Sequence, residues 1–189
     1  MSASISHTIK HRKTAKDVFY TPEAVVKNQI SLIESKPGDK WFDPFYGKGV
    51  YYKNFPTDNK VFTEIAMGKD FFEYRVPADQ QNIDIICSNP PYSMLDKVFE
   101  LTVQFQPRVI SYLLLHGAMT PKRMQFFTDA GYGLSSIYTT KVYAWYGMAE
   151  AYTFTRGHDW SNCKIRFDRI VHRLEDDKPK IETAAAPVS

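Results

Sequence analysis

The sequence predicts an α/β fold in which a mostly parallel central sheet carries helices on both faces. The first observation is that short apolar segments alternate with helix-like segments along the chain. The second is the segment Val109–Leu115, which is strongly apolar, as is typical of a central strand in a parallel sheet. The third is that glycine, proline and polar residues follow the apolar segments, at the sheet edge where such folds bind ligands.

Three shorter apolar segments, Trp41–Asp43, Lys60–Ile65 and Ile83–Cys87, predict further strands. Helices are expected from Pro22 to about Glu34, from Ser93 to about Gln106, and from Pro121 to near Gly131. Thr21 and Thr120 are expected to be the N-caps before the two prolines. Two strand-rich stretches, about Ser135–Trp145 and Lys164–His172, are expected to form an antiparallel hairpin at the C-terminal edge of the sheet.

The segment Asn89-Pro90-Pro91-Tyr92 is the most informative motif in the chain. Its prolines end the preceding strand abruptly, because proline lacks a backbone N–H group and fixes φ. Asn89 and Pro90 offer carbonyl acceptors for the two hydrogens of a planar amino group, and Tyr92 offers a ring that could stack behind it. An ordinary strand followed by a turn is the alternative interpretation.

A glycine-containing loop, Asp43–Gly49, follows the first predicted strand and suits a nucleotide-binding corner, although an ordinary turn is the alternative. Glu64 lies about 20 residues beyond Asp43, the separation at which such folds place an acid on ribose hydroxyls; the alternative is a solvated surface side chain. Asp70 and Phe71 suit an adenine amino group and a purine face, or equally a loop with one core phenylalanine.

Taken in order, these motifs resemble the S-adenosylmethionine-dependent amino-methyltransferases, and most closely the DNA adenine-N6 methyltransferases. The resemblance covers about residues 17–130. It implies a Rossmann-like class I methyltransferase fold and S-adenosylmethionine as the cofactor, with no metal. The residues it assigns to the cofactor are Tyr20, Thr21, Pro22, Asp43, Pro44, Phe45, Gly47, Gly49, Glu64, Asp70, Phe71 and Asn89, with Asp43 at the methionine end. The residues it assigns to catalysis are Asn89, Pro90, Pro91 and Tyr92.

Two features depart from that family. Tyr46 is bulky where many relatives have a small residue, so a narrowed pocket is expected. A minimal form is also expected, without the long recognition region that sequence-specific relatives carry after the catalytic domain. DNA adenine-N6 methylation is the preferred function, with RNA methylation, protein glutamine methylation and a non-enzymatic partner subunit as alternatives. A target base inside a duplex would have to be flipped out, or come from a single strand.

Length and composition predict one globular domain at residues 17–175, since 43% of the 189 residues are hydrophobic. Residues 1–16 are expected to form a basic arm and residues 176–189 a disordered tail. Two cysteines are too few for a disulfide framework and lie in no metal-ligand pattern. Without an apolar run that could span a membrane or a signal-peptide pattern, a cytoplasmic protein is expected.

Nucleic acid is the expected partner, and a homodimer is a further option that the small size of the domain leaves open. Phosphate contacts are expected from the basic arm, although a solubilising terminus would look the same. An aromatic and basic loop after about residue 143 could contact the target, or could pack against an edge strand. His116 could line the target pocket, or could be a core histidine. The residues assigned to nucleic-acid contact are Lys10, Arg12, Lys13, His116, Trp145, Tyr146 and Arg156.

Overall fold

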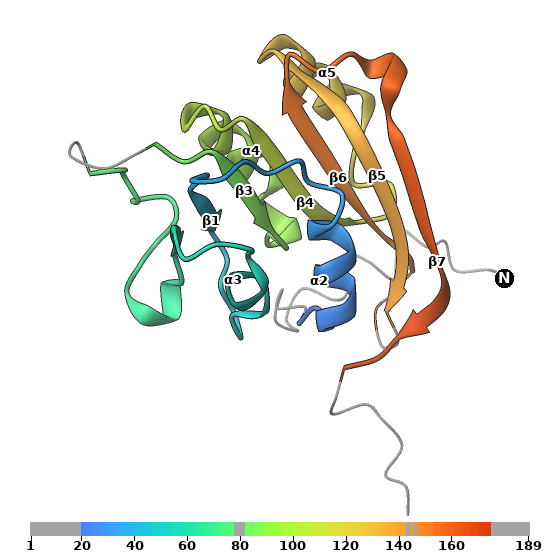
Figure 1. The fold of residues 1–189 in the computed structure, drawn as a ribbon, viewed down its shortest axis with the longest axis horizontal. Helices are drawn as coiled ribbons and strands as arrows, with labels where there is room; N and C mark the ends of the chain where they lie inside the picture. The colour runs from blue at the N-terminus through green and yellow to red at the C-terminus, as the bar shows by residue number, and fades with distance from the viewer. Residues whose placement is uncertain (1–19, 78–81, 143–144, 146, 175–189) are drawn as a thin grey trace, which may run out of the picture.

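The computed structural model describes residues 20–77, 82–142, 145 and 147–174 as a seven-stranded sheet with helices on both faces (Figure 1). The predicted basic arm and the predicted C-terminal tail lie outside the described residues. The strands are β1 (Trp41–Asp43), β2 (Lys60–Phe62), β3 (Ile85–Ser88), β4 (Val109–Leu115), β5 (Tyr132–Val142), β6 (Ala149–Arg156) and β7 (Lys164–His172). The helices are α2 (Glu23–Ile30), α3 (Val50–Asn54), α4 (Leu95–Gln104) and α5 (Pro121–Asp129), with short 3-10 turns η1 (Ile65–Met67), η2 (Tyr92–Met94) and η3 (Trp160–Asn162).

The strand order is β2-β1-β3-β4-β6-β5-β7, and β4 is central, as its apolar sequence predicts. Strands β2, β1, β3 and β4 pair in parallel, while β6 runs antiparallel between β4 and β5. These pairings confirm the predicted α/β class, with a mostly parallel sheet and an antiparallel C-terminal hairpin.

The predicted composition of that hairpin is wrong. The partner of β5 in the hairpin is β6, and the stretch Lys164–His172 instead forms the edge strand β7, parallel to β5. The polar and aromatic residues of Ala149–Arg156 suggest a loop, yet most of this strand is buried because it lies between two neighbours. Strand β6 is the only reversed strand among those described.

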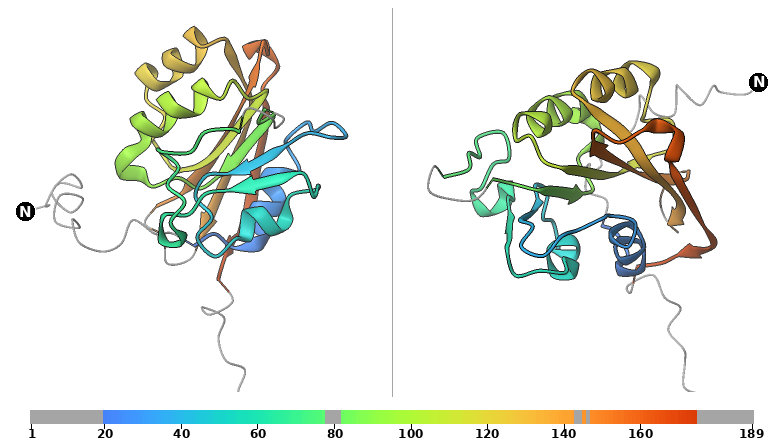
Figure 2. Two further views of the ribbon diagram at one scale, coloured as in Figure 1. Left: turned by 90° about the vertical axis from the view of Figure 1, so that its left-hand side faces the viewer. Right: turned by 45° about the horizontal axis from the view of Figure 1, so that its top comes forward.

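Side chains of successive strand residues point to opposite faces of the sheet, and both faces are covered. Trp41 packs on the face of α2 and α3, whereas Phe42 packs on the opposite face, in the cluster that includes Phe99 of α4 and Phe127 of α5. Figure 2 shows the two helical layers on either side of the sheet. This arrangement leaves the C-terminal ends of β1, β2 and β3 clear for the loops that follow them.

The start of α2 differs from the prediction. The helix begins at Glu23 with Pro22 in the N-cap position, and it ends at Ile30 rather than near Glu34. Thr21 lies one residue before the N-cap position, and its hydroxyl accepts a hydrogen bond from the Asn89 side chain. Thr120 does cap α5 as predicted, by accepting a hydrogen bond from a backbone amide of the first turn. No helix within the described ranges is long and apolar enough to cross a membrane.

Candidate active site

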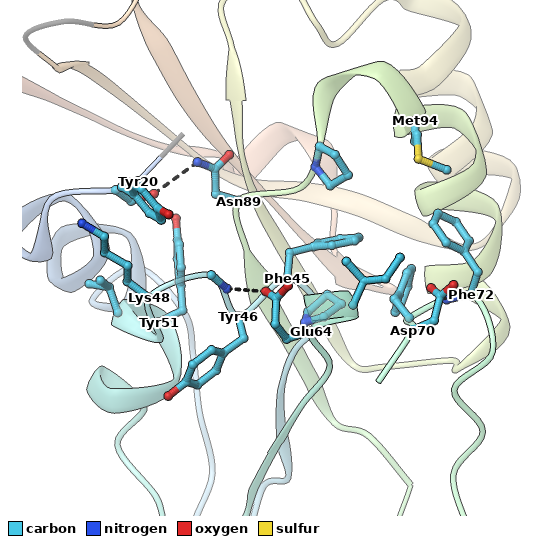
Figure 3. Close-up of a pocket in the computed structure, with 17 residues that line it drawn as sticks. Tyr20, Phe45, Tyr46, Lys48, Tyr51, Glu64, Asp70, Phe72, Asn89 and Met94 are labelled. Carbon is cyan, nitrogen blue, oxygen red and sulfur yellow. Dashed lines mark hydrogen bonds between the residues drawn. The ribbon is translucent and has the colours of Figure 1, made fainter. Parts of the chain in front are cut away.

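A cavity of about 420 Å³ lies at the C-terminal ends of β1, β2 and β3 (Figure 3). Most of the residues assigned to the cofactor from the sequence line this cavity, as do two residues of the motif at 89–92. The predicted residues in the lining are Tyr20, Thr21, Pro44, Phe45, Gly47, Glu64, Asp70, Phe71, Asn89 and Pro91. Pro22, Asp43, Gly49, Pro90 and Tyr92 lie outside the lining.

Asn89 joins the approach segment to the end of β3. Its side-chain nitrogen donates a hydrogen bond to the hydroxyl of Thr21 at 3.2 Å, and its amide oxygen, an acceptor, is buried. Pro91 lines the cavity, and Tyr92 begins η2, where it packs against the core cluster on the α4 side. The motif therefore ends the strand and turns the chain into α4 at the mouth of the cavity.

The glycine loop is held by Glu64, at the end of β2. The amide of Gly47 donates to the Glu64 carboxylate at 2.8 Å, and the amide of Ala66 donates to it at 3.1 Å. Gly47 has a φ of 52°, a left-handed conformation that favours glycine. Glu64 thus fixes the shape of the loop while its carboxylate remains in the cavity lining.

Tyr46 packs behind the loop. Its ring centroid lies 4.3 Å from that of Phe62, and in Figure 3 the ring points away from the centre of the cavity. The same ring fills the space beside Gly49, where an added Cβ would lie 2.3 Å from Tyr46 Cζ. Tyr46 belongs to the cavity lining although its ring points away from the centre, and the expected narrowing of the pocket stays a prediction.

Asp43 lies under the floor of the cavity and is completely buried. Its Oδ1 accepts hydrogen bonds from the Ser88 hydroxyl at 2.6 Å and from the Phe45 amide at 3.2 Å. Its Oδ2 is also buried and makes no hydrogen bond to any described residue. Burial raises the pKa of the Asp43 carboxyl to about 7, because the charged form is poorly solvated there. Asp43 therefore ties the ends of β1 and β3 together from below.

This raised pKa predicts a pH dependence of stability. Between about pH 4 and about pH 7 the folded state retains a proton that the unfolded state has lost, so the free energy of unfolding should fall as pH rises through this range. Asp43→Asn keeps the shape without the ionisable group, and we expect a smaller decline. Urea unfolding at a series of pH values measures the decline in the free energy of unfolding. Asp58→Asn, at an exposed residue, is the control. An unchanged decline in Asp43→Asn would contradict the prediction.

The end of the cavity away from Asn89 is aromatic. Phe45 and Phe71 make an edge-to-face contact with ring centroids 5.1 Å apart, and Phe72 adds a third ring to the lining. Asp70 accepts a hydrogen bond from the Phe72 amide at 2.9 Å, which orients its carboxylate beside these rings. Phe71 is also buried in the core, which confirms the interpretation of this segment as a loop with one core phenylalanine, while its role toward a purine stays a prediction. A flat ring with an amino group fits this end.

Comparisons with known proteins give a fold and no family. No family model matches the sequence, and no curated protein matches it. Among solved structures, the methyltransferase subunit of a type I restriction-modification system from Streptococcus thermophilus matches with a TM-score of 0.54 at 15% identity, over 80% of this chain and 48% of that one. A protein assigned as the modification subunit of a type I restriction enzyme from Vibrio vulnificus YJ016 matches with a TM-score of 0.52 at 15% identity, over 86% of this chain and 48% of that one.

The chain has the fold of these methyltransferase subunits. It spans about half the length of each, so the likeness concerns only part of those proteins. The fold agrees with the Rossmann-like class that the motifs imply. At this level of identity the likeness extends to the fold alone.

Several residues that line the cavity were not assigned to it from the sequence, although some of them are adjacent to the predicted motifs. Lys48 lies between the two predicted glycines, Val50 and Tyr51 follow them directly, and Phe72 follows Phe71. Ile65 and Met94 carry no local signal, because the fold brings η1 and η2 to the cavity.

Tyr51 also connects the cavity to a buried polar network. Its hydroxyl donates to the Gln29 side chain at 2.7 Å, and Gln29 donates to Ser111 at 3.0 Å. Burial raises the pKa of Tyr51, so its hydroxyl stays protonated and can remain a donor.

Of the residues assigned to nucleic-acid contact, the structure describes His116, Trp145 and Arg156. The side chain of His116 is 66% exposed, with Nδ1 3.1 Å from a Glu150 carboxylate oxygen, so it is not a core histidine, and it does not line the cavity. Trp145 is only 7% exposed and packs in the core beside Tyr138, so its ring is not available for stacking on a base. Arg156 is the last residue of β6 and pairs with Tyr132 at the start of β5, so it lies at the N-terminal ends of the parallel strands, away from the cavity. Lys10, Arg12, Lys13 and Tyr146 lie outside the described residues.

Proposed function

We propose that this chain transfers a methyl group from S-adenosylmethionine to the N6 amine of adenine in DNA. The observation that carries the proposal is one cavity lined by Asn89, Glu64 and Asp70, from three different segments of the chain. A volume of about 420 Å³ is of the size that small-molecule and cofactor sites have.

The chemistry of the lining fits the cofactor. The carboxylate of Asp70 suits an adenine amino group, with Phe45 and Phe72 beside the purine. Glu64 suits the ribose hydroxyls, since a carboxylate that already accepts two amide hydrogens has acceptor capacity left. Bound S-adenosylmethionine would supply an electrophilic methyl group on a sulfonium centre. Asn89 lies at the other end of the cavity, next to Thr21, where that methyl group would meet the target (Figure 3).

The residues of the motif would position the target amine. The lone pair of an aromatic amine is delocalised into its ring, which makes the nitrogen a poor nucleophile. Hydrogen bonds from the amine to the Asn89 side chain and the Pro90 carbonyl would favour a pyramidal nitrogen and aim its lone pair at the methyl group. This is catalysis by positioning and electrostatics. Tyr92 would stack on the flipped or single-stranded base.

The proposal is tested by a transfer assay with methyl-labelled S-adenosylmethionine. Duplex DNA, single-stranded DNA, structured RNA and a protein extract are offered side by side, and the modified products are digested and identified. We expect label in N6-methyladenine from DNA. Label only in RNA or only in protein would overturn the assignment of the substrate, and the absence of transfer to any of them would overturn the assignment of the activity.

A further inference from the structure

We infer that Lys48 binds the carboxylate of the amino-acid portion of the cofactor, so that the cavity selects ligands that carry an anion at this end. The inference rests on the proposed function, and it adds a residue and a selection rule to the same site. Lys48 is the cationic side chain among the described residues that line the cavity. The motifs assign it no role.

The backbone places Lys48 between two glycines that both adopt left-handed conformations. Gly47 has a φ of 52° and Gly49 a φ of 75°, so the loop turns sharply on either side of the lysine. The ammonium nitrogen of Lys48 lies 4.2 Å from the ring centroid of Tyr20, which belongs to the approach segment. Figure 3 shows the two side chains together, close to Asn89. The loop therefore brings a positive charge to the end of the cavity nearest Thr21.

Charges in the lining are ordered along the cavity. Lys48 lies at one end, Glu64 near the middle and Asp70 at the far end (Figure 3). A ligand with an amino group on a flat ring, then hydroxyl groups, then a carboxylate matches this order of charges. The reverse orientation would place the ligand carboxylate beside Asp70, where like charges repel. Lys48 thus fixes which way the ligand lies, and so which of its atoms faces Asn89.

Lys48 is exposed to solvent, which limits its contribution to the affinity for the ligand carboxylate. A charge-assisted hydrogen bond at a partly solvated site corresponds to a change of roughly ten-fold in affinity. The contribution should also weaken as salt is added, because a partly exposed ion pair is screened.

The test measures binding of two ligands by calorimetry: S-adenosylhomocysteine and its decarboxylated analogue, which keeps the amine and lacks the carboxylate. We expect Lys48→Met to weaken binding of S-adenosylhomocysteine by roughly ten-fold and to leave the decarboxylated analogue nearly unchanged. Lys48→Arg should keep most of the affinity. Lys97→Met, on the exposed surface of α4 and outside the lining, removes the same charge and should change neither ligand.

The outcomes separate this inference from the proposed function. If the wild-type chain binds S-adenosylhomocysteine but Lys48→Met weakens both ligands equally, or neither, the role of Lys48 is overturned and the cofactor assignment stands. If the wild-type chain does not bind S-adenosylhomocysteine, the cofactor assignment fails and this inference fails with it.

Discussion

Replacing Asn89 with alanine is expected to reduce the rate of methyl transfer by about 100-fold or more, as the loss of one precisely placed hydrogen-bonding group commonly does. The amide oxygen of Asn89 is the proposed acceptor for the target amine, and alanine removes it together with the bond to Thr21. Initial rates with methyl-labelled cofactor measure the effect. Binding of S-adenosylhomocysteine should change much less, since Glu64 and Asp70 remain in the lining.

Two controls make this prediction sharp. Asn162→Ala removes the same amide from the exposed turn η3, far along the chain from the cavity, and should leave the rate unchanged. Thr21→Val removes the hydroxyl that accepts from the Asn89 amide nitrogen but keeps the Asn89 oxygen, and should cause a smaller loss than Asn89→Ala. Full activity of Asn89→Ala would falsify the role of Asn89 in holding the amine.

Gly49→Ala is expected to destabilise the folded chain by about 2–4 kcal/mol, for two reasons that add. A left-handed conformation costs an alanine about 1–2 kcal/mol, and Gly49 has a φ of 75°. The added Cβ would also lie 2.3 Å from the ring of Tyr46, and moving that ring disturbs its contact with Phe62. Urea unfolding measures the loss.

Gly117 offers a matched control. It has a φ of 79°, yet an added Cβ there would meet no atom within 4 Å, so Gly117→Ala should show the backbone cost alone. In a chain that already carries Tyr46→Ala, Gly49→Ala should lower the free energy of unfolding by less than it does in the wild-type chain, because the clashing ring is absent. Equal losses for Gly49→Ala and Gly117→Ala would contradict the role assigned to the Tyr46 ring.

The parallel half of the sheet could be predicted because each strand there carries an unambiguous local signal. The run Ile85–Ser88 is buried, and the prolines after it end the strand. Strand β6 could not be predicted in the same way. It contains Glu150, whose burial is possible because Tyr152 donates a hydrogen bond to its carboxylate and His116 lies beside it. Such partners are set by the fold and leave no trace in local sequence.

The candidate site could likewise be predicted only in part. Glu64 was predicted from its separation from Asp43 and Asp70 from its position beside two aromatic residues, and both line the cavity. Asp43 was assigned to the cofactor by the resemblance, but its carboxyl is directed to Ser88 and a loop amide, and it lies outside the lining. Spacing along the chain places a residue at the sheet edge, while the direction of its side chain depends on neighbouring strands.

The most direct test of the central claim is calorimetric binding of S-adenosylhomocysteine to the wild-type chain and to Asp70→Ala. Asp70 lines the cavity beside its aromatic end, whereas Asp96 lies outside it on α4, so Asp96→Ala serves as the control. We expect one ligand bound per chain, with affinity lowered roughly ten-fold by Asp70→Ala and unchanged by Asp96→Ala. Absence of binding, or binding that Asp70→Ala does not weaken, would contradict the assignment of this cavity to the methyl donor.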